Sequence, residues 1–573
     1  MLILGLNNGI DAGAAVIDGG RVLSCINEER LNRQKNFWGP PLLSMEAVLR
    51  NAGVAPRDVE YVAESSLTSG GGPHLNFTEP PPMKALTEAV SLLPGSHSHL
   101  VKRLYFGVSS RRRRDDVVDA RLRELGCSAP KRFIEHHQCH AATAYYASPY
   151  GDAPEQVLVV TADGTGDGIC HSFATVGADH RLVRHHESTI YQSIAEVYGY
   201  VTHILGFRYN RHEGKITGLA AYGDSDRTIE VFRKLMGYDP ERLELRCRVP
   251  WGRLGARMLR RLLEGHSRED VAAGVQRAIE EVMTGLVSAA LRRYPRRYLC
   301  LAGGLFCNVR LNQALRELPG VDDVYVHPGM ADTGQGLGAA LSLWAELHER
   351  PVPVRLRDVY LGPAFSDAEI EAELRARGVS YRRSENVHAE TAELLAKNRI
   401  VARFAGRMEY GPRSLGHRSI LYDTSDKTVN DWLNHRLGRT EFMPFAPILL
   451  KERAAEFLED WSDDASVAAQ FMTITYRMTA HGQAHSPAVA HVDGTARPQV
   501  VTREDNPDSY AILSAYEART GRPILVNTSF NMHEEPIVCT PADAVNAFQR
   551  GHLDALSIGS FLVEQAEDAG RPR

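Results

Sequence analysis

The sequence predicts an α/β protein built from two domains. Short apolar or β-branched runs end in glycine-rich turns at several places, and helical patterns lie between them. We expect strands at 2–6, 157–160, 298–301 and 400–404. With 573 residues, the chain is also too long for one compact core. Alternating strands and helices predict sheet edges that open into sites.

The clearest helix pattern precedes the third of these strands. Val275, Ile279, Val282, Leu286 and Ala290 recur at intervals of three and four residues. On a helix this spacing puts all five side chains on one face. We therefore expect a helix here with a single apolar face.

A proline-stiffened stretch marks the change between the two domains. Residues 346–356 contain Pro351-Val-Pro353, which is typical of an extended linker. We predict domains at 1–350 and 351–573. Residues 224–270 carry no glycine-rich turn, and we interpret them as an insertion or lid in the first domain. The sequence shows no internal repeat.

The composition argues against nucleic acid and membranes as partners. The formal charge is -5, and the basic run at 111–114 is followed at once by two aspartates. No apolar stretch is long enough to span a bilayer, and the opening residues lack the pattern of a secretory signal. The eight cysteines are scattered without a Cys-x-x-Cys pair. We expect a cytoplasmic protein with a small-molecule partner, and leave open whether it forms a homodimer.

Three glycine-rich turns, two of them with acidic residues, follow predicted strands in the first domain. They contain Asp11, the run 163–168 and the run 302–308. Glycines let backbone amides approach phosphate oxygens, and a neighbouring acid can hold a metal ion. Any one of them could be a tight connection, but together they match the two phosphate loops and the adenosine loop of the actin/sugar-kinase/Hsp70-like ATPase fold. The predicted nucleotide-binding residues here are Gly164, Gly166, Asp167, Gly303, Gly304 and Asn308.

A histidine pair lies between the first two turns. His136 and His140 are four residues apart, so on a helix they share one face and can share a metal. Asp163 and Asp332 could complete the site. Two imidazoles and two carboxylates suit Fe²⁺, Mn²⁺ or Zn²⁺ rather than Ca²⁺. His137 points away from this face and is expected to cap the helix or contact a ligand residue.

Arginines recur beside glycine or proline turns in the second domain. An arginine side chain offers a rigid fork that suits phosphate oxygens. Small hydroxyl residues accompany these arginines, a pattern that a solvated basic surface explains poorly. We predict that the following residues contact phosphates or a nucleotide: Arg413, Arg418, Arg439, Arg497 and Ser529.

The motifs together resemble the nodulation-factor, cephamycin and tobramycin carbamoyltransferase family over nearly the whole chain. They include His136-His-x-x-His140, the run 163–168, Glu213-Gly-Lys215 and Ala302-Gly-Gly. The resemblance implies a first domain similar to tRNA threonylcarbamoyl transferases, with the metal held by the two outer histidines and two aspartates named above. It implies a YrdC-like second domain, in which ATP and carbamoyl phosphate give a carbamoyl-adenylate. Mg²⁺ is a further candidate ion.

Two departures from the family pattern bear on the chemistry. Members usually carry a His-Asp pair in the first turn, whose histidine deprotonates the acceptor hydroxyl, and this chain has Ile10-Asp11. We name Asp11, His137 and Lys215 as catalytic candidates. Another residue could replace the histidine, the acceptor could be an amine, or transfer could be impaired. The second departure is Met443, where some relatives have arginine.

The resulting prediction is an ATP- and metal-dependent carbamoyltransferase acting on a hydroxyl or amine of a small natural product or sugar. A catalytically impaired nucleotide-binding or regulatory homologue is one alternative, which Ile10 keeps open. A tRNA threonylcarbamoyl-type transferase is another, although it needs no second domain and the acidic chain disfavours it. The sequence does not select the acceptor, and 224–270 is the segment expected to set that choice.

Overall fold

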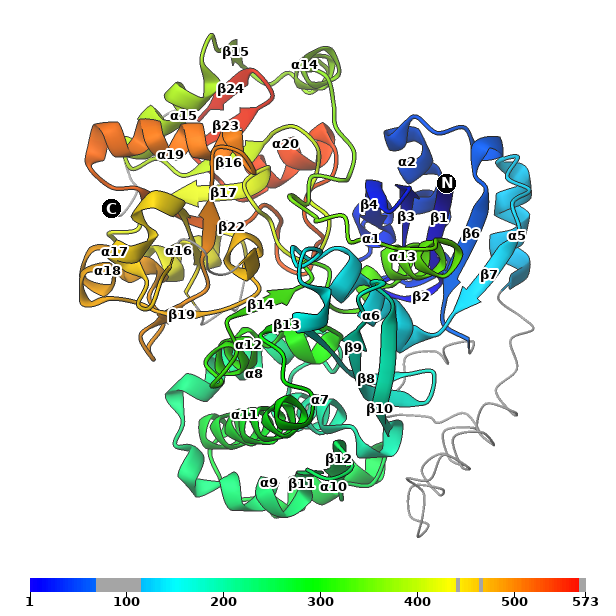
Figure 1. The fold of residues 1–573 in the computed structure, drawn as a ribbon. Coiled ribbons are helices and arrows are strands. Elements are labelled where there is room, and N and C mark those ends of the chain that lie inside the picture. Colours follow the sequence, from blue (N-terminus) through cyan, green and yellow to red (C-terminus); the bar gives the residue numbers. More distant parts are fainter. Residues whose placement is uncertain (68–114, 439–443, 463–466, 566–573) are drawn as a thin grey trace. The chain divides into compact units, whose positions relative to one another are not determined.

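The computed structural model describes residues 1–67, 115–438, 444–462 and 467–565 and confirms the α/β class (Figure 1). The chain divides into two units: Met1–Glu28 with Asn36–Leu356, and Glu29–Lys35 with Arg357–Arg573. Arg439, Met443 and the basic run at 111–114 lie outside the described residues. Within the described ranges, no helix is both long and apolar enough to cross a membrane.

The first unit contains two five-stranded sheets with the same strand order. The first sheet is ordered β4-β3-β1-β6-β7 and the second β10-β9-β8-β13-β14. In each, the first three strands are antiparallel neighbours and the last two run parallel to the first. The strand bounds are β1 Leu2–Asn7, β3 Gly13–Asp18, β4 Arg21–Asn27, β6 Tyr61–Ser65, β7 Lys131–Ile134, β8 Val157–Gly166, β9 Ile169–Val176, β10 Leu182–Thr189, β13 Tyr298–Ala302 and β14 Asp323–Val326. The repeat lies in strand order and direction, which explains why the residue pattern did not show it.

Each half ends in a helix that packs on the sheet of the other half. α6 (His136–Tyr146) follows β7 and packs on β8 and β13, whereas α13 (Gln335–Leu347) follows β14 and packs on β1 and β6. The two helices also pack against each other, closely enough that a Cβ on Gly338 would lie 2.3 Å from the Cys139 carbonyl oxygen. This crossing brings the starts of α6 and α13 to the ends of β8 and β1.

The remaining helices of the first unit surround both sheets, with α2 packed on β3 and β4 of the first sheet. The predicted apolar helix is α11 (Arg268–Arg293), whose five predicted face residues are buried. Residues 224–270 fold into α9 (Ile229–Leu235), the hairpin of β11 (Met236–Asp239) and β12 (Glu244–Cys247), and α10 (Arg253–Leu262), packed on α11 and α7. Other elements are α2 Leu42–Ala52, α5 Asp115–Glu124, α7 Ile194–Ile204, α8 Glu213–Leu219, α12 Val309–Arg316, and the short pair β2 Gly9–Ile10 and β5 Trp38–Gly39.

The second unit is built on an eight-stranded sheet ordered β15-β24-β23-β16-β17-β22-β18-β21. Its strands are β15 Arg382–Arg383, β16 Val401–Phe404, β17 Arg418–Tyr422, β18 Ala446–Leu450, β21 Gln499–Val501, β22 Ile524–Ser529, β23 Ala555–Ile558 and β24 Phe561–Glu564. A buried apolar core joins the sheet to α15 and α19. The main helices are α14 Asp367–Ala376, α15 Val387–Ala396, α16 Val429–Arg436, α19 Pro507–Thr520 and α20 Pro541–Arg550.

One segment assigned by sequence to the first domain belongs to the second unit. Glu29–Lys35 overlaps α1 (Glu28–Asn32) and docks through arginines. Arg30 Nη2 donates to the Gly411 carbonyl at 2.9 Å, and Arg33 donates to the carbonyls of Pro536 and Ile537 at 2.8 and 2.7 Å. These contacts join residues far apart in the chain, so no local pattern indicated them.

Candidate functional site

The structure brings the four predicted metal ligands of the first unit together. His136 and His140 project from the first two turns of α6, Asp163 lies near the end of β8, and Asp332 directly precedes α13. One ligand atom from each residue lies within 4.8 Å of all the others. The cluster therefore sits where the crossed helices α6 and α13 begin, with two ligands from each half of the unit.

The spacing of these atoms fits a shared divalent cation. The Nε2 atoms of His136 and His140 are 3.1 Å apart, and Asp163 Oδ2 lies 2.9 Å from His140 Nε2 and 3.4 Å from His136 Nε2. Asp332 Oδ1 lies 3.4 and 3.6 Å from the same two nitrogens. Ligands about 2.1 Å from one metal stand about 3.0 Å apart in octahedral and about 3.4 Å apart in tetrahedral geometry. The donor set fits Fe²⁺, Mn²⁺ or Zn²⁺.

The electrostatics of the cluster favour positive charge at its centre. Burial disfavours the imidazolium of His136, but the carboxylates of Asp332 and Asp163 outweigh burial and raise the pKa of His136 to about 10. Burial acts to raise the pKa of Asp163, yet hydrogen bonds from His136 and His140 hold it well below its usual range. A site that retains a buried proton in this way can exchange it for a metal cation.

The start of α6 is fixed by two carboxylates. Glu135 caps the helix by accepting from the backbone N–H groups of His137 and Gln138, both at 2.9 Å. Asp167 accepts from His136 N at 2.8 Å and also from Ser66 and Leu67. Asp167, predicted to bind nucleotide, thus orients the start of α6 in this structure.

The close approach of His136, a predicted metal ligand, requires glycine at position 166. A Cβ at this position would lie 2.0 Å from Cδ2 of His136. Gly304 passes similarly close to Asp163, because its Cβ would lie 3.0 Å from Oδ1. Gly303 has a φ of 114° and donates to the Met330 carbonyl at 2.6 Å. Two of the three predicted turns therefore meet at Asp163.

His137 occupies a different position from its neighbours. Its ring is 0% exposed, with Nδ1 2.7 Å from Thr161 Oγ1 and Nε2 donating to the Ile169 carbonyl at 3.1 Å. Burial, reinforced by His136 and His140, holds the pKa of His137 well below its usual range. Both ring nitrogens are engaged within the protein, so the ring fastens α6 to β8 and β9.

Two asparagines connect the first glycine-rich turn, which contains Asp11, to the loop that contains Asp332. Asn7 Nδ2 donates to the carbonyls of Ile10, Asp11 and Asp332 at 2.7, 3.3 and 3.1 Å. Asn27 Nδ2 donates to Asp11 O at 3.2 Å and Thr333 O at 3.3 Å. Sequence reasoning missed both asparagines, although Asn7 directly follows the predicted first strand and ends β1. They place Asp11, whose φ is 50°, beside the loop of Asp332.

Two other predicted residues of this unit make contacts with residues outside the four predicted metal ligands. Asn308 caps α12 by accepting from Leu311 N at 3.1 Å, and its amide pairs with that of Gln276 at 2.8 and 3.1 Å. Lys215 lies buried on α8, with Nζ 5.9 Å from the Phe207 ring centre. The structure thus gives Asn308 a helix-capping role that its sequence motif did not indicate.

Glu196 is a buried acid that the sequence did not single out. It is 4% exposed on α7, and both carboxylate oxygens accept from Tyr209 Oη at 2.7 Å. A Cβ on Gly164 would lie 2.8 Å from Glu196 Oε1, so the carboxylate lies against the residue that follows Asp163. Burial raises the pKa of Glu196 to about 7. A lone glutamate in a helical pattern gives no sequence signal for such a position.

In the second unit, three predicted phosphate contacts gather at one edge of the sheet. β17 and β18 both run antiparallel to β22, and β21 runs parallel to β18. The starts of β17 and β21 therefore share an edge with the end of β22. Arg413 precedes β17, Arg497 precedes β21, and Ser529 ends β22. Burial, together with the nearby charge of Arg413, holds the pKa of Arg497 well below its usual range.

Arg418 is turned into the protein instead. It is 0% exposed, and its guanidinium donates to the carbonyls of Ala405, Gly406 and His417 while lying 3.7 Å from the Phe404 ring centre. Burial lowers the pKa of Arg418 to about 10. In this structure the guanidinium of Arg418 donates to backbone carbonyls, and the phosphate contact at this position stays a prediction.

Comparison with known proteins identifies the family. The family model described as "Carbamoyltransferase N-terminus" matches residues 2–341, and "Carbamoyltransferase C-terminus" matches residues 392–565. The chain belongs to the carbamoyltransferase family. The first match spans the metal cluster, and the second spans the arginine-bearing sheet edge.

Relatives of this carbamoyltransferase cover nearly its whole length. Nodulation protein NolNO of Sinorhizobium fredii is 31% identical over 99% of this chain and 83% of its own. The uncharacterized protein sll1178 of Synechocystis is 31% identical over 98% of this chain and 96% of its own. Among solved structures, full-length HypF in a phosphate- and nucleotide-bound form has a TM-score of 0.33 and 15% identity over 61% of this chain and 46% of its own. So loose a similarity carries no weight, and the fold rests on the strand order.

Proposed function

We propose that this carbamoyltransferase uses ATP and carbamoyl phosphate to carbamoylate a hydroxyl or amine of a small molecule. The observation that carries the proposal is the cluster of two imidazoles and two carboxylates in a chain of this family. A second observation is the pair of arginines at the sheet edge of the other unit. We further propose that the first unit is an actin-like ATPase domain, that the second is YrdC-like, and that the protein acts in the cytoplasm.

His136, His140, Asp163 and Asp332 would hold the metal, with Fe²⁺ preferred over Mn²⁺ or Zn²⁺ by family resemblance. When bound, the metal supplies Lewis acidity toward a phosphate or carbonyl oxygen. The residues around it keep this site in shape. Asp167 and Glu135 fix the first turn of α6, and His137 fixes its position on β8.

Arg413 and Arg497 would neutralise the phosphates of the activation step. Water converts carbamoyl phosphate to carbamate and phosphate, and a carbamate oxygen then bonds to the α-phosphorus of ATP as pyrophosphate leaves. The acceptor oxygen or nitrogen next attacks the carbamoyl carbon, AMP leaves, and the acceptor loses one proton. Guanidinium forks suit the crowded anionic oxygens of the first stage. Ser529 ends β22 at the same edge and would contact the same ligand.

The proton acceptor for the second stage differs from the family pattern. Ile10 carries no basic atom, and His137 has both nitrogens engaged within the protein. We therefore withdraw the base role for His137 and keep Asp11 and Lys215 as candidates for the base. Ile10 also favours a second candidate function, in which the chain completes activation but transfers the carbamoyl group poorly.

Mass spectrometry of the purified protein with ATP, carbamoyl phosphate and Fe²⁺ tests the proposal. Carbamoyl-adenylate and pyrophosphate are the expected products without any acceptor. Elemental analysis of the wild type beside His140→Ala tests the metal site. Equal metal content in both proteins would refute the ligand assignment, and nucleotide binding without either product would refute the activation step.

A further inference from the structure

The loop at 405–417, between β16 and β17, carries Arg413 and is anchored by buried groups outside the predicted site. The first anchor is Glu409, which is 2% exposed. Its Oε1 accepts from the backbone N–H groups of Leu415, His417 and Arg418 at 2.8, 2.9 and 3.0 Å. Hydrogen bonds to an ionised acceptor are stronger than neutral ones, so one carboxylate closes the second half of the loop.

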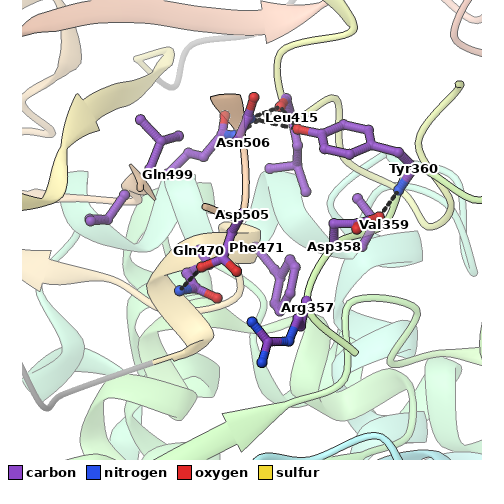
Figure 2. Close-up of a pocket in the computed structure, with 12 residues that line it drawn as sticks. Arg357, Asp358, Val359, Tyr360, Leu415, Gln470, Phe471, Gln499, Asp505 and Asn506 are labelled. Atoms are coloured by element: carbon purple, nitrogen blue, oxygen red, sulfur yellow. Dashed lines mark hydrogen bonds between the residues drawn. The ribbon is translucent and has the colours of Figure 1, made fainter. Parts of the chain in front are cut away.

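The second anchor is the carbonyl oxygen of Leu415. It accepts from Tyr360 Oη at 2.7 Å, Gln499 Nε2 at 2.8 Å and Asn506 Nδ2 at 3.1 Å. Figure 2 shows these side chains converging on Leu415, with Asn506 also bonded to Tyr360. The Tyr360 ring stacks on His417, with ring centres 3.7 Å apart. A carbonyl has two lone pairs, so three donors saturate it.

The backbone on both sides of Arg413 is held as well. The Gly411 carbonyl accepts from Arg30 at 2.9 Å, and the Ser414 carbonyl accepts from Asn527 Nδ2 at 3.3 Å. Asn527 in turn donates to Gln499 Oε1 at 2.6 Å. Gln499 thus contacts the loop directly at Leu415 and, through Asn527, at Ser414, the two residues that follow Arg413.

The space among these donors is a support and not a ligand cavity. The pocket in Figure 2 encloses about 20 Å³, which is room for about one water molecule. Its lining includes Gln470, which donates to Asp505 at 3.2 Å and, in contrast to Gln499, makes no described hydrogen bond to the loop. The two glutamines therefore line the same pocket, but only Gln499 has a described hydrogen bond to the loop that carries Arg413.

We propose that Glu409, Tyr360, Gln499 and Asn506 are positioning residues that hold Arg413 ready for a phosphate-bearing ligand. This inference rests on the proposed function of Arg413. A guanidinium on a fixed loop loses less freedom on binding than one on a loose loop, so pre-positioning raises affinity without a new contact.

Calorimetric titration of the full-length protein with inorganic phosphate tests the inference independently of turnover. The variants are Gln499→Leu, Gln470→Leu, Arg413→Ala and the double variant Gln499→Leu/Arg413→Ala. We expect Gln499→Leu to raise the Kd about fivefold or more, because hydrogen bonds that fix the loop are lost. Gln470→Leu, in the same pocket, should stay within about twofold. Arg413→Ala should raise the Kd more than either, and the double variant should match it.

That non-additivity separates positioning from a general loss of structure. If Gln499 acts through Arg413, removing Arg413 leaves Gln499 nothing further to contribute. Three results would each overturn the inference. They are a Kd of the double variant that rises by the product of the two single effects, an unchanged Kd in Gln499→Leu, and no phosphate binding by the wild type. Phosphate binding without carbamoyl-adenylate formation would contradict the proposed function alone. The comparison of the two single variants with the double variant would still decide whether Gln499 positions Arg413.

A pair of variants at Glu409 checks the first anchor. Glu409→Gln keeps an oxygen that accepts the three backbone N–H groups, whereas Glu409→Ala removes it. We expect Glu409→Gln to bind phosphate within about threefold of the wild type and Glu409→Ala to lose about tenfold or more. Equal losses in both variants would show that the charge of Glu409, and not its hold on the loop, is what matters.

Discussion

The two candidate sites of this carbamoyltransferase have opposite charge. The site in the first unit collects carboxylates and imidazoles, with Asp163 and Asp332 beside His136 and His140 and a further acid at Glu196. The site in the second unit collects guanidinium groups on turns at one sheet edge. The first is suited to a cation and the second to phosphates, which is the difference on which the proposed metal-dependent and activating steps rest.

The sites also differ in how far the sequence could predict them. The histidines of the predicted metal site came from residue type and helical spacing, because few side chains bind metals and His136 and His140 had to share a face. The family resemblance assigned Asp163 and Asp332 as the other two ligands. Arginines serve equally as ligands or as internal donors, so spacing could not show that Arg418 points inward. Nor could it show that Asp167 and Asn308 support helix starts.

The fold was predictable to a similar extent. The strands and the α11 face follow local periodicity, and all of them are confirmed. The duplicated strand order and the docking of Glu29–Lys35 depend on contacts between distant residues, which periodicity does not report. Glu409, Glu196 and Asn7 were missed because their roles are hydrogen bonds to backbone or to a single side chain.

The largest expected effect is at the metal site. His140→Ala should reduce bound metal to less than about one tenth per chain and lower carbamoyl transfer about a thousandfold or more. Carbamoyl-adenylate formation should persist, because the arginines belong to the other site. Elemental analysis and product quantification check this. His185→Ala is the control, because His185 lies on β10, in the sheet whose strand β8 carries Asp163. Loss of both carbamoyl transfer and carbamoyl-adenylate formation in His140→Ala would contradict the assignment of the two steps to separate sites.

Two arginine substitutions sharpen the contrast within the second site. Arg413→Ala should slow pyrophosphate release about a hundredfold and change the free energy of unfolding by less than about 0.5 kcal/mol. Arg418→Ala should lower the free energy of unfolding by about 3 kcal/mol or more, because buried carbonyls lose their donors. Urea unfolding and pyrophosphate assays measure the two effects. A large loss of stability in Arg413→Ala, with slowed pyrophosphate release only in Arg418→Ala, would contradict these roles.

The buried acid beside the metal site makes stability depend on pH. Burial raises the pKa of Glu196 to about 7 in the folded protein, from 4.5 for an exposed glutamate. Between these values the folded state binds more protons, so the free energy of unfolding falls as pH rises, by about 3 kcal/mol in all. Glu196→Gln should remove this decline between pH 4.5 and 8 in urea titrations. The exposed Glu241→Gln should leave it in place, and an unchanged slope in Glu196→Gln would contradict the burial argument.

The smallest effect is expected at Asn308. Asn308→Ala should cost about 1 kcal/mol of stability by removing the cap of α12. Because the amide is paired with Gln276, the KM for ATP should stay within about threefold. Thermal unfolding and ATP kinetics check both values, and a much larger rise in KM would restore the nucleotide contact first predicted for Asn308.

The most direct test of the two-site account is the fate of ATP labelled at the α-phosphorus. We predict that, without an acceptor, the wild-type protein converts it to labelled carbamoyl-adenylate only when carbamoyl phosphate is present, with pyrophosphate released in equal amount. Formation of ADP, or of AMP at the same rate without carbamoyl phosphate, would contradict carbamoyl-adenylate as the link between the arginine site and the metal site.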